Sequence, residues 1–397
     1  PPRRRRGREG RRPGSVMPMV AAATVLMFAL VTLVLGLILA FTPYLMRRNE
    51  CFAVTVPAAA QADPRIASLK KRYARIMVAV AVAFTVLAAV AGACIVLETE
   101  SADAVSYLGV ALECAAVFGP VLASFALMLV YRRKVIELKR SEGWAATRCE
   151  RTAVVGEEGV PRPIPLAWNL AYVVVILLTA VLGLALYPCM PDLIPMHGDF
   201  AGNVDSYAEK SVGSVFGFPL LMEAFMALIF LGCHAVMIRS KRPTDPGAPA
   251  TSALAYGLFA RAQSIFLLVV GVVINAGIGI GFMLSSAGII SLVQFGVGMV
   301  VVGAVVLIGS VTISVVYGQA GSRLLRRMQG SDLLPDDDDE HWKLGIFYVN
   351  RNDPSVFLPE RFGIGWTINF ARPAAWVLVG CFLAVDAGVV AAVALLA

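Results

Sequence analysis

The chain contains few charged residues for its length. Asp, Glu, Lys and Arg make up only 15% of its 397 residues, whereas apolar residues make up 58%. An ordinary soluble domain carries about 25% charged residues, because water has to solvate its surface. The scarcity of charge therefore excludes a typical soluble enzyme or binding domain and indicates a protein whose solvent is the lipid bilayer.

The sequence also lacks the residue patterns on which catalysis and metal binding usually depend. Its seven cysteines form no C-x-x-C pair, and its histidines are only His197, His234 and His341. Neither the H-E-x-x-H zinc motif nor the G-x-S-x-G nucleophile motif occurs. An intramembrane hydrolase is therefore the least favoured class, and we expect a protein that is not an enzyme and that holds no cofactor and no metal.

Long apolar runs are what the sequence has in abundance. Each reaches the length of about 20 residues that a helix needs to cross a hydrocarbon core about 30 Å thick. The eight runs cover residues 18–41, 76–97, 105–131, 166–187, 212–238, 254–284, 289–317 and 374–397. The pattern predicts an all-α polytopic membrane protein with about eight transmembrane helices and a small β-rich cytoplasmic segment before the last helix.

These runs divide the chain into parts with different expected roles. We expect a basic tail at 1–17, an N-terminal membrane part with three helices at 18–165, a helix–loop–helix unit at 166–238, a Gly-rich helix pair at 239–317, a cytoplasmic β-rich domain at 318–373 and a last helix at 374–397. The tail has no initiating Met. It is either an extension upstream of a natural start at Met17 or Met19, or a disordered basic arm that stays in the cytoplasm.

The distribution of Lys and Arg predicts how the chain crosses the membrane, because cytoplasmic loops retain positive charge far more than exported loops do. If the N-terminus is outside, 25 of the 34 Lys and Arg residues fall in four cytoplasmic loops and only Lys210 falls in an exported loop. The seven Arg residues of the tail contradict this arrangement. We expect a multi-pass protein of a bacterial plasma membrane with both termini outside. Its basic residues flank apolar runs, which favours anionic lipid over nucleic acid as their partner.

The exported loop between the predicted fourth and fifth helices holds the first candidate site. The candidate residues are Pro191, Asp192, Pro195, His197, Gly202, Asp205 and Lys210. Such a cluster suits a cation, a peptide or a carboxylate, but a metal site normally needs more than one His or a tight set of carboxylates. The remaining interpretations are a surface that binds a partner and a stiff polar turn held by its own hydrogen bonds.

This loop resembles the signature of a known family. The spacing P-D-x-I-P-x-H, followed by G-x-x-D and Lys210, is similar to the loop of the bacterial SdpI-like immunity membrane proteins, over residues 166–238. The resemblance implies a protein without enzymatic chemistry that protects a cell from a membrane-active peptide toxin or reports its presence. The implied partners are that exported peptide and a cytoplasmic regulator.

The last cytoplasmic loop holds the second candidate site. An acidic run at 336–340 precedes β-type runs separated by a turn. The run is interpreted most simply as a solvated linker, and the less favoured alternative is that it pairs with the basic loops. The segment resembles a domain of unknown function that is often joined to the first. Its candidate residues are Trp342, Asn350, Asp353, Arg361, Gly363, Gly365, Trp366 and Asn369. We expect the two Trp residues to anchor at the membrane interface and Arg361 to bind phosphates or carboxylates.

Polar residues inside the apolar runs form a third set. Glu113, Glu223 and Asn275 are costly in lipid unless they are paired or hydrated, which makes them functional candidates. Glu113 is the strongest of them, with Asn275 as its expected partner. The favoured interpretation is a structural role in bonding neighbouring helices, and the other is a proton or ion pathway.

Two functional hypotheses remain. The leading one is an SdpI-like immunity or sensing protein, and it depends on the loop resemblance. The alternative is a secondary transporter that uses Glu113 and the Gly-rich helices at 254–317, in the manner of discontinuous helices at a substrate site. A transporter of that kind predicts an internal repeat, and the sequence shows no convincing one.

Overall fold

The computed structural model describes residues 16–47, 49–96, 103–144, 160–198, 204–245, 248–328, 337–363 and 365–396. Most of this length is helical, which confirms the predicted all-α polytopic class. The basic tail up to residue 15 and the candidate Gly202 lie outside the described residues.

The described helices run through the whole chain. They are α1 (Val16–Leu45), α2 (Pro64–Val96), α3 (Asp103–Ser141), α4 (Leu170–Leu186), α5 (Phe218–Arg239), α6 (Pro249–Ser286), α7 (Leu292–Val316), the short α8 (Ser322–Arg327) and α9 (Pro373–Leu396). Within the described residues, seven helices, α1 to α7, are long and apolar enough to cross a membrane. The predicted eighth span corresponds to α9. Its described apolar part, Pro373–Gly388, is shorter than the other seven spans.

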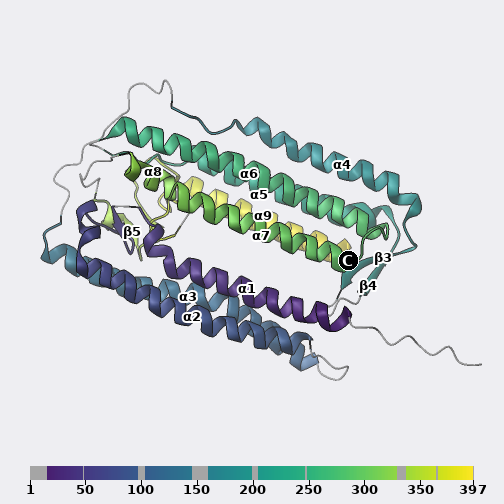
Figure 1. Cartoon of the computed structure of the whole chain (residues 1–397). Helices are drawn as coiled ribbons and strands as arrows, with labels where there is room; N and C mark the ends of the chain where they lie inside the picture. Colours follow the sequence, from purple (N-terminus) through teal and green to yellow (C-terminus); the bar gives the residue numbers. More distant parts are fainter. Residues whose placement is uncertain are drawn as a thin grey trace, which may run out of the picture.

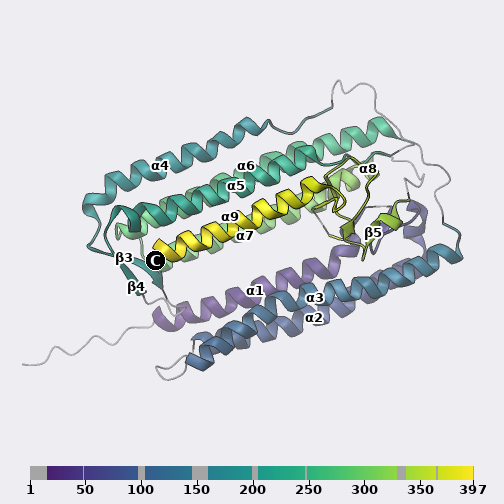
Figure 2. The same cartoon turned by 180° about the vertical axis from the view of Figure 1, so that it is seen from behind.

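The helices form two groups that lie side by side (Figures 1 and 2). The N-terminal helix group is α1, α2 and α3, and the C-terminal helix group is α4, α5, α6, α7 and α9. Close packing in each group depends on small residues, since a Cβ at Gly36 of α1 would lie 2.4 Å from Ala81 Cβ of α2. In the C-terminal helix group, α6 packs against α4, α5 and α7.

A tight hairpin joins α6 and α7. Gly288 makes the turn with φ +70°, a conformation that favours glycine. Helix α7 then begins with a capping box, in which Ser291 and Gln294 each accept a hydrogen bond from the other's backbone N–H. The described chain therefore turns back into the bundle within five residues of the end of α6.

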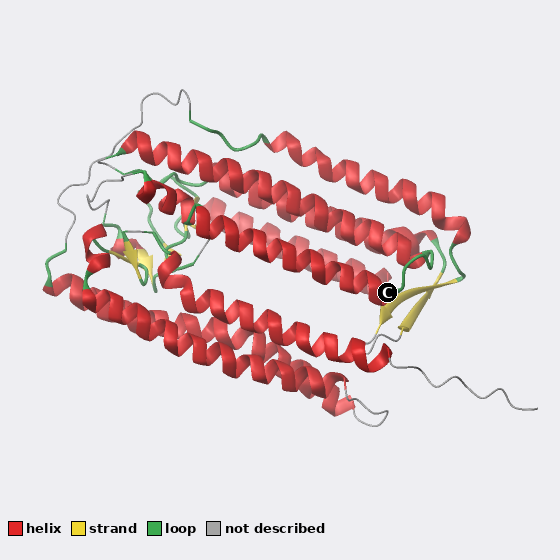
Figure 3. Cartoon of the chain, in the orientation of Figure 1, coloured by secondary structure: helices red, strands yellow, loops and turns green. Residues whose placement is uncertain are grey.

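The strands form four antiparallel pairs at the two ends of the bundle (Figure 3). They are β1 (Glu50–Cys51) with β2 (Val54–Thr55), β3 (Leu193–Gly198) with β4 (Val204–Glu209), β5 (Trp342–Lys343) with β6 (Phe347–Tyr348), and β7 (Phe357–Pro359) with β8 (Trp366–Ile368). The β3–β4 pair lies at one end of the helices, and β5 lies at the opposite end with α8. The two candidate loops are thus separated by the length of the bundle.

Helices α3 and α6 are longer than a membrane requires. They contain 39 and 38 residues, or about 57 Å each at 1.5 Å per residue. A hydrocarbon core is only about 30 Å thick, so the helix ends project beyond it. The projecting end of α3 carries Arg132 and Lys139, and both contact the C-terminal segment, defined as residues 337–372. This overhang supplies the platform for the site at that end.

Candidate functional site

The β3–β4 hairpin brings two of the predicted residues together. His197 Nδ1 lies 2.7 Å from Asp205 Oδ1, and the two side chains are 70% and 45% exposed. The strands pair His197 with Ser206, with register shifts on both sides of His197. Such irregularities re-aim a side chain out of the regular pleat. The result is an imidazole–carboxylate pair that is open to a partner in solution.

The other residues of this loop support the hairpin. The backbone N–H of Lys210 donates to the carbonyl of Asp192 at 2.8 Å, and Lys210 Nζ donates to the carbonyl of Met190 at 2.9 Å. Lys210 also lies over the ring of Tyr187, 5.0 Å from its centroid. The Lys210 ammonium is therefore engaged with the loop itself, whereas the side chains of His197 and Asp205 are exposed.

The exposed side of the hairpin combines acidic and apolar side chains. Asp192 and Glu209 are exposed together with Asp205. Leu193 and Tyr207 are 56% and 55% exposed. Among the residues that the structure describes, no group of three His, Cys, Asp or Glu side chains is placed to hold a metal ion. The exposed side of the hairpin therefore presents carboxylates next to apolar area.

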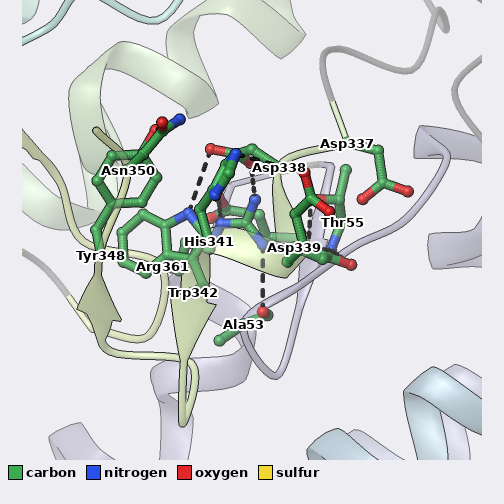
Figure 4. A network of polar contacts seen from close by, with 12 residues as sticks. Ala53, Thr55, Asp337, Asp338, Asp339, His341, Trp342, Tyr348, Asn350 and Arg361 are labelled. Atoms are coloured by element: carbon green, nitrogen blue, oxygen red, sulfur yellow. Dashed lines mark hydrogen bonds and ion pairs between the residues drawn. The ribbon is translucent and has the colours of Figure 1, made fainter. Parts of the chain in front are cut away.

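Arg361 forms the centre of the site at the opposite end (Figure 4). Its side chain is only 3% exposed and makes ion pairs with Asp338 and Asp339. The guanidinium also donates to the carbonyl of Ala53 at 3.4 Å and lies 5.0 Å from the ring centroid of Trp342. Planar guanidinium groups suit such sites, because their donors reach several acceptors at once. The predicted carboxylate partners of Arg361 are thus residues of the same chain.

The acidic run is part of this network, so its interpretation as a solvated linker is wrong. Lys139 of α3 pairs with both Asp337 and Asp339 at 2.7 Å. Asp339 also accepts a hydrogen bond from the backbone N–H of Thr55 at 3.0 Å. Burial alone would raise the pKa of Asp339, but Arg361 and Lys139 outweigh it and lower the pKa to about 2. The stabilisation from this carboxylate is therefore lost only as the pH falls below its ordinary value of 3.8 and through about 2.

The loop after α1 supplies a third carboxylate to this network, and unlike Asp338 and Asp339 it is buried. Glu50 is 6% exposed and pairs with Arg47 at 2.9 Å and with Arg361 at 3.8 Å. Burial raises the pKa of Glu50, although Arg47 and Arg361 act to lower it. Since Glu50 follows α1 and Arg361 precedes α9, this contact joins the loop after the first helix to the segment before the last one.

An aromatic cluster packs beside the ionic network. Phe52 is fully buried, and its ring centroid lies 5.3 Å from that of Tyr73 on α2 and 5.2 Å from that of Tyr131 on α3. Phe362, the residue after Arg361, packs on Phe52 at 6.4 Å. The C-terminal segment is therefore fixed to the N-terminal helix group by apolar contacts as well as by charges.

The same segment is also fixed to the C-terminal helix group. Lys241, just after α5, pairs with Asp353 at 2.7 Å, and its backbone N–H donates to the carbonyl of Phe357 at 2.9 Å. Gln319 Nε2, from the α7–α8 link, donates to the carbonyls of Glu360 and Gly365. The C-terminal segment thus bridges the two helix groups.

Most of the remaining predicted residues of this segment have a scaffolding role. Asn369 is fully buried, and its Nδ2 donates to the carbonyls of Asn350 and Asp353 at 2.8 and 3.2 Å. Trp342 is 4% exposed, and Trp366 packs against Phe259 of α6 with ring centroids 6.4 Å apart. Trp342 is therefore packed against protein, which contradicts its expected role as an interface anchor, whereas Trp366 is half-buried and its anchoring stays a prediction.

Gly363 and Gly365 leave room for the side chain of Glu360. A Cβ would lie 3.3 Å from Glu360 Oε2 at Gly363, where φ is +130°, and 3.6 Å from it at Gly365. Glu360 forms no ion pair with any residue that the structure describes. Burial raises the pKa of Glu360 from 4.5 to about 7.

Glu360 predicts a specific pH dependence of stability. The folded protein keeps a proton that the unfolded chain releases between pH 4.5 and about 7, so stability should fall as the pH rises through this window. The free energy of unfolding should fall by roughly 3 kcal/mol in total over this pH window. In Glu360→Gln the melting temperature in detergent should vary less over this range and should exceed that of the wild type above it. Glu340→Gln, at an 80% exposed side chain of the same segment, should behave as the wild type.

The intramembrane residues are not paired as the sequence analysis expected. Glu113 lies on α3 and Asn275 on α6, in different helix groups, and neither side-chain oxygen of Glu113 has a hydrogen-bond partner in the structure. Asn275 Nδ2 donates instead to the carbonyl of Gly271 at 2.7 Å. Glu223 is fully buried and accepts a hydrogen bond from Thr179 at 2.8 Å. The expected pairing of Glu113 with Asn275 is therefore wrong.

Sequence reasoning missed the partners that complete the network at the C-terminal segment. Glu50 and Phe52 lie in a short loop whose residues look unremarkable in the sequence. Sequence reasoning also missed Thr179, the partner of Glu223 in the membrane-spanning helices, because it is one polar residue in an apolar helix. The available signal was charge balance, because a buried Arg in a segment that follows an acidic run requires carboxylates nearby.

Comparisons with known proteins match two parts of the chain. Residues 174–222 match a domain of unknown function (DUF1648), and residues 351–376 match a family of unknown function (DUF5808). The first match covers most of α4, the β3–β4 hairpin and the start of α5, and the second covers the Arg361 turn. No curated protein and no solved structure matches the chain. The chain is accordingly similar, over these two stretches, to two families of unknown function, and the SdpI-like resemblance remains a prediction.

Proposed function

We propose that this integral membrane protein is a non-enzymatic, SdpI-like immunity or sensing protein of a bacterial plasma membrane. Its β3–β4 hairpin binds a membrane-active peptide outside the cell, and its C-terminal segment meets a regulator inside. The observation that carries the proposal is the exposed His197–Asp205 pair at the far end of the bundle from the Arg361 network.

The chemistry of the hairpin indicates the kind of peptide. Its exposed carboxylates attract a cationic ligand, and Leu193 and Tyr207 provide apolar contact area. Membrane-active peptides commonly combine a basic face with an apolar face. A ligand of this class fits both features of the surface.

The peptide proposal predicts a survival phenotype. Cells that carry the wild-type protein should survive a cationic membrane-active peptide better than cells that carry His197→Ala or Asp205→Ala. Ser206→Ala changes the residue that pairs with His197 in the register, next to Asp205, and leaves the His197–Asp205 pair intact, so it should protect as the wild type does. Equal survival with all four proteins, at equal amounts in the membrane, would contradict the proposal.

The assignment of sides predicts a labelling pattern. In a background without the native cysteines, a thiol reagent that does not cross membranes should label Ser206→Cys in intact cells and should miss Arg351→Cys. Both positions are exposed, so burial does not protect either of them. The reverse pattern would place the hairpin inside the cell and would remove the basis for peptide binding there.

A further inference from the structure

A polar seam runs through the C-terminal helix group, between α4, α5 and α6. On α6, Ser264, Asn275 and Ser286 follow one another at intervals of eleven residues, which is close to three helical turns, and all three are buried. His234 of α5 lies toward one end of the seam, where its Nδ1 lies 2.9 Å from Asn169 Nδ2 and its Nε2 lies 3.1 Å from the carbonyl of Ile164. The seam therefore carries polar atoms along the membrane-spanning length of these helices.

Glu223 is the only carboxylate of the described part of this seam. It is 0% exposed, and its Oε1 accepts a hydrogen bond from Thr179 Oγ1 on α4. A Cβ at Gly279 of α6 would lie 2.1 Å from Glu223 Oε1 and 2.4 Å from Thr179 Oγ1. The absence of a side chain at Gly279 is thus what admits the carboxylate between the three helices.

Two buried oxygens of the seam have no hydrogen-bond partner in the structure. They are Glu223 Oε2 and Asn275 Oδ1, and Asn275 lies one helical turn from Gly279 on the same face of α6. No described basic residue forms an ion pair with Glu223. An ionised carboxylate in this position is too costly without a counter-charge, so the group must bind a cation or accept a proton.

We propose that α4, α5 and α6 hold a binding site for a small monovalent cation, the proton or Na⁺, at Glu223, Thr179 and Asn275. A proton converts Glu223 from a group that only accepts hydrogen bonds into one that also donates, which suits the unpaired oxygen of Asn275. Na⁺ uses the same unpaired oxygens as ligands. The site is separate from the hairpin and independent of peptide binding.

The groups around Glu223 make it the titrating element of the seam. Thr179 and Gly279 are its direct neighbours, and neither is ionisable. Tyr172 of α4 contacts Gly271 of α6 two turns away along that helix, and His234 follows Glu223 by eleven residues on α5. Replacing Glu223 should therefore remove the cation-dependent signal, whereas changes outside α4, α5 and α6 should leave it intact.

The test measures the carboxylic-acid C=O stretch of the full chain in lipid nanodiscs by infrared difference spectroscopy. In the wild type, the component that Glu223→Gln removes should diminish on a change from acidic to alkaline buffer if the ligand is the proton. If the ligand is Na⁺, that component should diminish on addition of Na⁺ at constant pH, and Na⁺ should raise the melting temperature relative to N-methylglucamine. Glu113→Gln changes the intramembrane glutamate of α3 and should leave the response of this band to pH or Na⁺ unchanged. Thr179→Val should shift the pH or the Na⁺ concentration at which half of the change has occurred.

Two outcomes would overturn the proposal. In one, the carboxylic-acid C=O band of Glu223 is present but changes neither with pH nor with Na⁺. Glu223 would then be a permanently protonated residue with a purely structural hydrogen bond. In the other, Glu223→Gln retains the full spectral and thermal response of the wild type. Since Glu223→Gln keeps the size and the hydrogen-bonding capacity of the side chain, a folded variant is expected for the comparison.

Discussion

Arg361→Ala is expected to lower the free energy of unfolding by about 3 kcal/mol or more. The substitution leaves Asp338, Asp339 and Glu50 without their shared cation in a largely buried site. Removing one partner of such a pair costs more than the pair contributes, because the remaining charges stay desolvated. The effect can be measured by denaturant titration of the purified protein in detergent.

Arg351→Ala is the matched control for this experiment. Arg351 belongs to the same segment and has the same charge, but its side chain is exposed. A surface substitution of this kind usually changes stability by less than about 0.5 kcal/mol. If both variants lost stability equally, the effect would come from net charge, and the Arg361 network would not be the joint between the helix groups.

Phe52→Ala should be comparably damaging, with a loss of about 3–5 kcal/mol. The ring is fully buried and packs on Tyr73, Tyr131 and Phe362, so its removal opens a cavity between α2, α3 and the C-terminal segment. The same denaturant titration measures the loss. Phe52→Leu retains most of the apolar volume and should cost less than half as much. A loss below about 1 kcal/mol for Phe52→Ala would show that the cluster does not hold this end together.

The sequence was sufficient for the architecture because the bilayer imposes a simple rule. A span must be apolar for about 20 residues. Most ends of the predicted runs lie within a few residues of the ends of α1 to α7, but α2 begins well before residue 76 and α3 continues well past residue 131. The hairpin β3–β4 was not predicted, since Pro195 within a run normally argues against a strand. The structure accommodates Pro195 opposite Tyr207 in a pair that has only two strands, where no third strand requires its missing N–H.

The sites were less accessible to sequence reasoning, since they depend on contacts between distant residues. The local spacing of His197 and Asp205 was enough to place both in one loop, and the structure brings them into hydrogen-bond distance. Nothing local links Asp339 to Thr55, which are 284 residues apart in the chain. For Glu113, apolar surroundings identified an interesting residue but gave no information about which helix lies next to it.

The long sequence separation between the halves of the Arg361 joint sets the order in which the protein can assemble. Domains form in sequence during synthesis, at about 5–20 residues per second. Helices α1 to α3 therefore enter the membrane well before residues 337–372 are synthesised. The interval of 284 residues between Thr55 and Asp339 takes roughly 15 to 60 seconds to translate, and Glu50 and Phe52 have no partners from the C-terminal segment during this time. During that time the exposed aromatic and carboxylate groups are open to chaperones and proteases. Translation that stops before residue 337 leaves an N-terminal helix group that never acquires its partner and is a target for membrane quality control.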